Sequence, residues 1–278
     1  MALSVMDCLP SVVSRRVRVL SNFLFLLRLL FVTASPLFAQ QPPSDPQAVA
    51  YAGQSIAAIT GGNTIYDVTL TGNITWGGST KPETGSVVLL ALGTGESRMD
   101  MSLPSGMRSE IRDASTGVAQ GEWVAPNGTS GLFSLENCAT DAVWFFPALG
   151  SLARGTNIVL LYIGQETRNG VLVQHIQSYV YQPNPGGENP TPQHLSTMDF
   201  YLDIATLVPV SITYNAHPDN GATTDLPVEI KLFDYQNVNG VLVPTHIQRL
   251  LQGNLTVDIS ISGAAFNTGL PLSEFAIN

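Results

Sequence analysis

The sequence predicts an α+β domain that is built mostly from antiparallel strands. From Tyr66 to Trp76, apolar and polar side chains alternate, so one face of this segment is expected to be buried and the other wet. Asn-Gly pairs at 169–170 and 239–240 lie between apolar runs, which is typical of tight β-hairpins. No amphipathic helix separates the later strand candidates, and this excludes a parallel α/β sheet.

Residues 1–39 have the order of a cleavable export signal. Arg15, Arg16 and Arg18 precede an apolar run over 19–31, and a small-residue cleavage site ends at Ala39. The alternative is an uncleaved anchor, but the run is shorter than the roughly 20 residues that a spanning helix needs and contains Arg28. We therefore expect cleavage, no transmembrane anchor afterwards, and a periplasmic or secreted domain.

The composition after cleavage limits the partners. Removal of 1–39 takes away four arginines and one aspartate, which leaves 8 basic and 20 acidic residues and a net charge of −12. Such a charge disfavours binding to nucleic acid. Cys138 is the single cysteine left, so no disulfide can form within the chain, and export without a disulfide favours a bacterial periplasm.

Residues 40–278 predict a single domain that begins with a helix. Asp45-Pro46 is a helix start and Gly61-Gly62 a helix end. The stripe expected to pack on the sheet consists of Val49, Ala52, Ile56 and Ile59. Strands are expected over 66–76, 86–92, 97–103, 107–113, 129–135, 158–167, 171–181, 198–205, 208–215, 227–235, 241–251 and 254–262. Residues 182–192 (QPNPGGENPTP) predict a flexible loop rather than a domain boundary.

Two hairpins repeat one short motif. Residues 169–173 and 239–243 share the sequence NGVLV, and each is followed by a His-Ile-Gln tripeptide. The second copy has one more residue before its histidine, at Pro244. That extra residue is expected to change which face the following side chains occupy, unless a β-bulge absorbs it.

The segment 141–154 (DAVWFFPALGSLAR) is the second helical candidate. Pro147 predicts a kink, and the run of Trp144, Phe145 and Phe146 is too apolar for a surface. Two interpretations remain open: these side chains fill the core, or they line a cavity.

The residues offer little catalytic chemistry. Histidines 175, 194, 217 and 246 show no metal-ligand spacing, although a zinc site formed only in the folded chain stays possible. Cys138 could act as a nucleophile with a distant histidine, but a lone cysteine is more often a small buried hydrophobe. We therefore expect no cofactor and no enzymatic activity.

The last third of the chain resembles a known superfamily. The stretch 199–212 (DFYLDIATLVPVSI) resembles a strand–turn–strand of LolA/LolB-like proteins, in which an Asp ends one strand and a Thr and a Leu–Pro open the next. Residues 228–248 resemble the following hairpin, and 267–275 resemble the closing tail. The helix that ends in Gly61-Gly62 also lies where this superfamily has its first helix.

This resemblance implies a fold and a function. The fold is an incompletely closed antiparallel half-barrel that wraps short helices around an apolar cavity. The implied function is a non-enzymatic carrier of an acyl chain or another apolar ligand, with a lipid or a lipoprotein acyl chain as the possible partner. Two alternatives stay open: the aromatic residues are plain core, or the domain is a protein-interaction or envelope-sensing module with an envelope protein as partner. The residues expected to cover or line the cavity are Trp144, Phe145, Phe146, Leu149, Trp76 and Tyr201.

Overall fold

The computed structural model describes residues 41–77, 81–115, 119–138, 140, 157–184, 187–188, 190–218 and 221–277. The predicted export signal, 1–39, and the segment 141–154 with Trp144, Phe145, Phe146 and Leu149 lie outside these residues. Residues 41–278 form one compact unit. None of the helices within the described ranges has the length and apolar character needed to cross a membrane.

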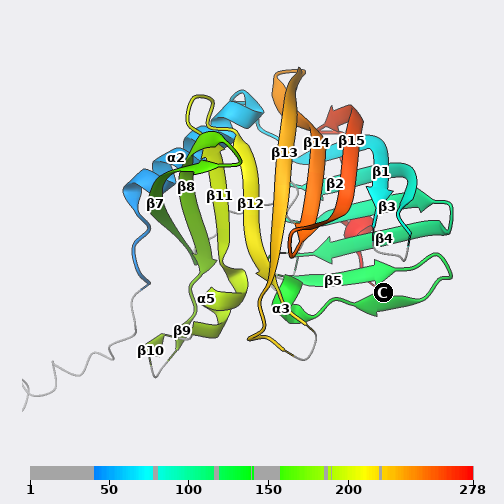
Figure 1. Cartoon of the computed structure of the whole chain (residues 1–278), viewed down its shortest axis with the longest axis horizontal. Coiled ribbons are helices and arrows are strands. Elements are labelled where there is room, and N and C mark those ends of the chain that lie inside the picture. The colour runs from blue at the N-terminus through cyan, green and yellow to red at the C-terminus, as the bar shows by residue number, and fades with distance from the viewer. Residues whose placement is uncertain are drawn as a thin grey trace, which may run out of the picture. The chain divides into compact units, whose positions relative to one another are not determined.

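Thirteen strands of the described part of the chain form one antiparallel sheet (Figure 1). Their order is β6-β5-β4-β3-β2-β1-β15-β14-β13-β12-β11-β8-β7, with open edges at β6 and β7. The sheet does not close into a barrel, so the predicted half-barrel is confirmed. The strands are β1 (Asp67–Trp76), β2 (Glu83–Leu92), β3 (Ser97–Leu103), β4 (Gly106–Asp113), β5 (Gln120–Val124), β6 (Ser130–Leu132), β7 (Ile158–Arg168), β8 (Val171–Val180), β11 (Met198–Asp203), β12 (Pro209–Ala216), β13 (Leu226–Val238), β14 (Val241–Leu251) and β15 (Asn254–Phe266).

The strands that come first and last along the chain, β1 and β15, pair with each other. β1 runs antiparallel to β15, with Val68 opposite Phe266 and Trp76 opposite Val257. This pairing joins a meander of β1 to β6 to a second meander of β7 to β15. The two ends of the domain thereby stabilise each other at the middle of the sheet.

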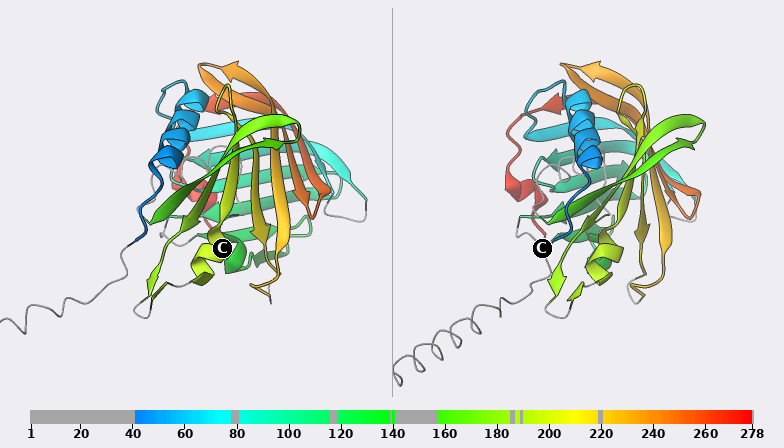
Figure 2. Two further views of the ribbon diagram at one scale, coloured as in Figure 1. Left: turned by 60° about the vertical axis from the view of Figure 1, so that its left-hand side comes forward. Right: turned by 90° about the vertical axis from the view of Figure 1, so that its left-hand side faces the viewer.

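Helix α2 (Pro46–Thr60) packs inside the curve of the sheet (Figure 2). The helix contacts β7, β8 and β14. We call the face that carries this helix and the core cluster the inner face, and the opposite one the outer face. The core cluster on the inner face includes Ala48, Ala52 and Ile59 of α2, together with alternate residues of the strands. The prediction was wrong for Val49, which is exposed; Ala48 lies on the packed stripe instead.

The ends of α2 follow the local sequence. The Asp45 carboxylate accepts a hydrogen bond from the Gln47 amide at 2.7 Å, and Pro46 occupies the first turn, where no amide hydrogen is needed. Gly61 ends the helix with φ +61°, a conformation that glycine adopts without steric cost. These two signals place the helix within one residue of its predicted bounds.

Local sequence failed to predict some short elements. β5 was not expected, because Gln120-Gly-Glu-Trp-Val124 shows no clear apolar alternation. Residues 182–192 contain the two-residue strands β9 (Pro183–Asn184) and β10 (Gly187–Glu188) and the start of helix α5 (Pro190–Ser196). Two further short helices are α3 (Leu135–Cys138) and the 3-10 helix η1 (Leu272–Phe275).

The repeated NGVLV motif forms two tight turns, but the valines that follow the two turns lie on opposite faces of the sheet. Both central pairs, Asn169-Gly170 and Asn239-Gly240, have positive φ, as the predicted turn chemistry requires. Val243 is part of the core cluster, whereas its counterpart Val173 is not. His175 and His246 nevertheless both lie on the outer face, each beside an aspartate. The extra residue at Pro244 therefore changes the face of the second motif, since the β13–β14 pairing keeps one register along its whole length.

Candidate functional site

The inner face at β1 to β3 is an apolar wall. Its fully or almost fully buried side chains are Leu70, Ile74, Val87, Leu89, Met99 and Met101. The contacts of α2 concentrate on β7, β8 and β14, at the other part of the sheet. Two methionines side by side give this wall a deformable surface, because the unbranched thioether side chain adapts to irregular shapes.

Trp76 lies on this inner face and is buried. The guanidinium carbon of Arg108, from β4, lies 4.2 Å from the centre of the Trp76 ring, in cation–π geometry. Arg108 belongs to the inner face because its cross-strand partner is Met101 of β3, which is an inner-face residue. Its Nε atom is buried and has no hydrogen-bond partner, and no ion pair to Arg108 occurs among the described residues.

A second arginine crosses the concave side of the sheet. Arg249 of β14 pairs with Val257 and Ile230, which places it on the inner face. Its Nη1 atom lies 3.4 Å from Oε2 of Glu110 on β4, and the two side chains are only 18% and 19% exposed. β4 and β14 are five strand positions apart, which is about 24 Å along a flat sheet at ~4.8 Å per strand. The ion pair is possible because the sheet curls and brings the two strands to face each other.

The structure does not bring Trp76 and Tyr201 together. Cross-strand partners share a face, and partners link Tyr201 through Ser211, Lys231, Gln248 and Asp258 to Thr75. Thr75 neighbours Trp76 in β1 and so points the other way. Tyr201 is therefore an outer-face residue, whereas Trp76 is an inner-face residue.

Tyr201 belongs to a polar cluster on the outer face. Its ring lies 4.5 Å from the ring of His175, and the guanidinium of Arg168 lies 4.4 Å from its centre. Burial raises the pKa of the Tyr201 hydroxyl, so this group stays protonated. His175 also contacts two carboxylates, with Nε2 2.8 Å from Asp199 and Nδ1 3.2 Å from Glu166.

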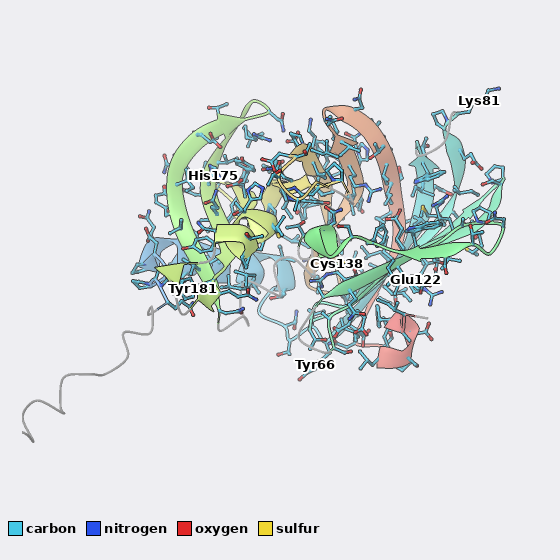
Figure 3. All side chains as sticks on the ribbon, turned by 90° about the horizontal axis from the view of Figure 1, so that it is seen from below. Tyr66, Lys81, Glu122, Cys138, His175 and Tyr181 are labelled. Atoms are coloured by element: carbon cyan, nitrogen blue, oxygen red, sulfur yellow. The ribbon has the colours of Figure 1, made fainter. Side chains whose placement is uncertain are left out.

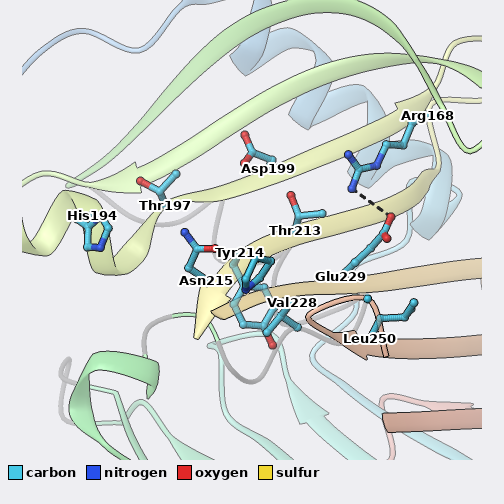
Figure 4. A pocket seen from close by; sticks show the side chains of 12 residues that line it. Arg168, His194, Thr197, Asp199, Thr213, Tyr214, Asn215, Val228, Glu229 and Leu250 are labelled. Atoms are coloured by element: carbon cyan, nitrogen blue, oxygen red, sulfur yellow. Dashed lines mark hydrogen bonds and ion pairs between the residues drawn. The ribbon is translucent and has the colours of Figure 1, made fainter. Parts of the chain in front are cut away.

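A polar cleft of about 410 Å³ lies beside this cluster (Figure 4). Arg168 crosses its upper end and forms an ion pair with Glu229 at 3.2 Å. Burial alone would raise the pKa of Glu229, but hydrogen bonds from Ser211 and Asn169 and the nearby Arg168 hold this pKa below its usual range. In the close-up, α2 lies behind the sheet, so this cleft is on the outer face. Its lining is Arg168, His194, Thr197, Asp199, Thr213, Tyr214, Asn215, Pro227, Val228, Glu229, Leu250 and Gly253.

Cys138 is a buried thiol at the end of α3 (Figure 3). It is 2% exposed, and its Sγ lies 3.3 Å from the carbonyl oxygen of Ser134. The interpretation of Cys138 as a small buried residue fits this environment, because a reactive thiol needs access and a group that favours the thiolate. His175 lies on a different element, β8.

Comparison with solved structures identifies the architecture. The chain is similar to a domain assigned to outer membrane lipoprotein sorting in Vibrio parahaemolyticus, with a TM-score of 0.53 and 12% identity over 82% of this chain and 96% of that one. It is also similar to a LolA superfamily protein from Nitrosomonas europaea, with a TM-score of 0.50 and 13% identity over 83% and 97% of the two chains. The fold is LolA/LolB-like.

The same LolA/LolB-like architecture extends to another family. A DUF1329 family protein from Desulfovibrio piger matches with a TM-score of 0.50 and 11% identity over 84% of this chain and 98% of that one. No protein-family model and no curated protein matches the sequence itself. The similarity therefore establishes the fold of this chain and leaves its ligand to the chemistry of its own residues.

Sequence reasoning missed the charged residues of the LolA/LolB-like inner face. Alternation along β4 puts Arg108 and Glu110 on one face, so they could have been grouped with each other. Nothing in the local sequence shows that this face is the inner one, because the neighbouring residues Met107, Ser109 and Ile111 look equally suited to burial. The contact between β4 and β14 arises from the curvature of the sheet. It joins Glu110 to Arg249, which lies 139 residues later in the sequence.

Proposed function

We propose that this chain is an exported, non-enzymatic carrier or binder of an acyl chain or another apolar ligand, held on the inner face of its half-barrel. The observation that carries the proposal is the apolar wall of β1 to β3, with Trp76 at its border. Burial of a tail of about 15 methylenes would contribute about 12 kcal/mol before ordering costs, so binding needs no covalent chemistry. An export signal at 1–39 and action in the bacterial envelope belong to the same proposal.

In this proposal, the segment 141–154 covers the ligand. Its sequence supplies Trp144, Phe145, Phe146 and Leu149 close together, and Pro147 favours a bent segment over a straight helix. Trp76 is the strand residue that supplies a wall. Tyr201 is not included, because its side chain faces away from the apolar wall.

The charge of Arg108 specifies one end of the ligand. Arg108 is partly buried and has no ion pair within the described residues. A partly buried cation without a counter-charge is costly, and an anionic ligand group beside it would compensate that cost. Stacking on Trp76 holds the guanidinium in place. Its Nε, which has no hydrogen-bond partner within the described residues, is thereby presented in a fixed direction. We therefore propose an amphiphile with an apolar tail and an anionic end, such as a carboxylate or a phosphate.

Displacement of a fluorescent fatty-acid probe tests the inner face. Trp76→Ala is expected to weaken probe binding by roughly tenfold or more, since a buried aromatic side chain contributes about 1.5–3 kcal/mol. Tyr201→Ala is the matched control, because it removes a buried aromatic side chain from the outer face and should leave the affinity unchanged. No saturable probe binding by the wild type, or equal losses in both variants, would contradict the proposal.

A pair of ligands with one chain length tests the anionic end. The wild type is expected to bind a fatty acid more tightly than the corresponding fatty alcohol, by roughly tenfold or more for one charge-assisted interaction. Arg108→Gln should abolish this preference, whereas Arg98→Gln, which removes an arginine paired with Asp100, should keep it. Equal affinity of the wild type for the acid and the alcohol would contradict the proposed anionic end of the ligand. It would not contradict the carrier function.

The polar outer-face cleft favours a second candidate function, the binding of an envelope protein. Its lining of charged and hydroxyl side chains suits a polar peptide better than an acyl chain. Asn215→Trp would fill the cleft, whereas Trp76→Ala would leave it intact. Capture of one protein partner that is lost only in Asn215→Trp would favour this function; equal capture by both variants would exclude the cleft as the binding surface.

A further inference from the structure

We propose that His194, His217 and Asp225 bind one divalent transition-metal ion, for which Zn²⁺ is the suitable probe. The three residues come from separate segments: His194 lies in α5, His217 directly follows β12, and Asp225 directly precedes β13. One ligand atom from each lies within 4.8 Å of those of the other two, and this is the one such group among the described residues. The site is independent of the proposed carrier function, because it does not use the inner face.

The geometry of the cluster is close to a coordination shell. His194 Nε2 lies 3.1 Å from Asp225 Oδ1, and His217 Nδ1 lies 3.6 Å from the same oxygen. The two imidazole rings lie 5.2 Å apart. Ligands bound to one Zn²⁺ at about 2.0–2.2 Å lie roughly 3–3.6 Å from one another, so small side-chain rotations suffice to form the site.

His217 is held in place before any ion binds. The side chain of Asn137 in α3 bonds its backbone twice: Oδ1 accepts from the His217 amide at 2.7 Å, and Nδ2 donates to its carbonyl oxygen at 2.8 Å. The imidazole is 0% exposed, and Nδ1 lies 3.2 Å from the carbonyl oxygen of Thr224. Nδ1 is the ring nitrogen that faces Asp225, so it is the atom through which His217 would bind the ion.

The two other ligands leave the site open to solvent. The side chains of His194 and Asp225 are 43% and 44% exposed, and His194 also lines the polar cleft (Figure 4). Two imidazole nitrogens and one carboxylate suit Zn²⁺ and similar transition metals better than Mg²⁺ or Ca²⁺, which prefer oxygen ligands. Three protein ligands also leave at least one coordination position for water or for a group that enters the cleft.

Two other histidine–aspartate pairs in the same sheet show what a plain pair looks like. His246 Nε2 lies 2.9 Å from Asp258, and His175 Nε2 lies 2.8 Å from Asp199. In each pair the aspartate also accepts a hydrogen bond from a glutamine, Gln248 or Gln177. The proposed site differs, because two histidines share one carboxylate and no glutamine within the described ranges donates to it.

Zinc titration of the purified chain tests the site. The chain is stripped with a chelator, dialysed, and titrated with Zn²⁺ in competition with a chromophoric chelator. The wild type is expected to bind one equivalent, and His194→Gln or Asp225→Asn should weaken binding by at least about tenfold. Both residues are largely exposed, so these variants should keep the wild-type circular dichroism spectrum.

His246→Gln and Asp258→Asn are the matched controls, since they disrupt a histidine–aspartate pair that lacks a second histidine. Both are expected to bind Zn²⁺ like the wild type. The proposal is overturned if the wild type takes up no saturable equivalent. It is also overturned if the control variants lose as much affinity as His194→Gln and Asp225→Asn.

Discussion

Single carboxylates at the ends of strands fix the path of the chain. The side chain of Asp67 accepts hydrogen bonds from the amides of Thr268 and Gly269 at 2.8 Å each, and Asn267 bonds the backbone at Thr64 and Tyr66. Asp203 accepts from the amides of Ala205 and Thr206 in the same way. Asp203 explains the turn chemistry that resembles the LolA/LolB-like pattern, because it closes its turn with its own side chain. Asp67 instead fastens the C-terminal tail to the start of β1.

Asp67→Asn is expected to lower the free energy of unfolding by about 1–3 kcal/mol at pH 7, because the charge-assisted hydrogen bonds to the tail are weakened. Burial acts to raise the pKa of Asp67, but the hydrogen bonds from Thr268, Gly269 and Leu270 outweigh it and lower this pKa. Because the folded-state pKa is lower than the unfolded-state pKa, the ionised carboxylate stabilises the fold. This stabilisation is fully present above the unfolded-state pKa and is lost as the pH falls through the folded-state pKa.

Urea denaturation across pH 3–7 measures this effect. The difference between the wild type and Asp67→Asn should shrink toward low pH as the carboxylate of the wild type is protonated. Asp113→Asn, at an exposed turn where the carboxylate accepts from Ser115, is the control and should cost less. A constant difference from pH 7 to pH 3 would contradict this role of the charge.

At the scale of helices and strands, an element could be predicted when the residues that determine it are close together in the sequence. The bounds of α2 follow from Asp45, Pro46 and Gly61, which act on adjacent backbone groups. The longer strands follow from alternation, and β3 and β14 have the predicted bounds. β5 and α5 were missed because their packing on neighbours, rather than a local pattern, determines them.

Two glycines test the backbone argument with opposite expected signs. Gly170 has φ +81° in the first NGVLV turn, and Gly53 lies in α2; nothing lies within 4 Å of a Cβ added at either. Gly170→Ala should destabilise by about 1 kcal/mol, because alanine disfavours positive φ. Gly53→Ala should stabilise by about 0.5–1 kcal/mol, because it removes a glycine from a helix interior.

Thermal and urea unfolding of both variants checks this pair. Since no steric clash is involved at either site, the difference in sign isolates backbone conformation. A destabilised Gly53→Ala or a neutral Gly170→Ala would contradict the assigned backbone geometry.

For the molecule as a whole, the curvature of the sheet is the property that local sequence could not supply. The strands, their order in the last third and the open barrel followed from alternation, turn chemistry and the superfamily resemblance. The pairing of Arg249 with Glu110 requires strands of the two meanders to face each other. The stacking of Arg108 on Trp76 brings together β4 and β1, which are three strand positions apart in the first meander. The expected cavity residues were chosen by apolarity, and the register then separated Trp76 from Tyr201.

A double-mutant cycle of Glu110→Gln and Arg249→Gln tests the curvature in solution. The two side chains are mostly buried, so a favourable coupling energy of about 1 kcal/mol is expected in urea denaturation. A cycle of Glu110→Gln with Arg168→Gln is the control and should show no coupling, because Arg168 lies on the outer face with Glu229. Zero coupling in the first cycle would indicate a flatter sheet.

Photo-crosslinking locates the ligand most directly. A fatty acid that carries a diazirine in its chain is bound to the purified protein and irradiated, and the labelled residues are identified by mass spectrometry. The account predicts saturable labelling of the inner-face wall, at Met99, Met101 or Trp76, that excess unlabelled fatty acid suppresses. Labelling confined to outer-face residues around Asp199 and Thr213, or no saturable labelling, would contradict it.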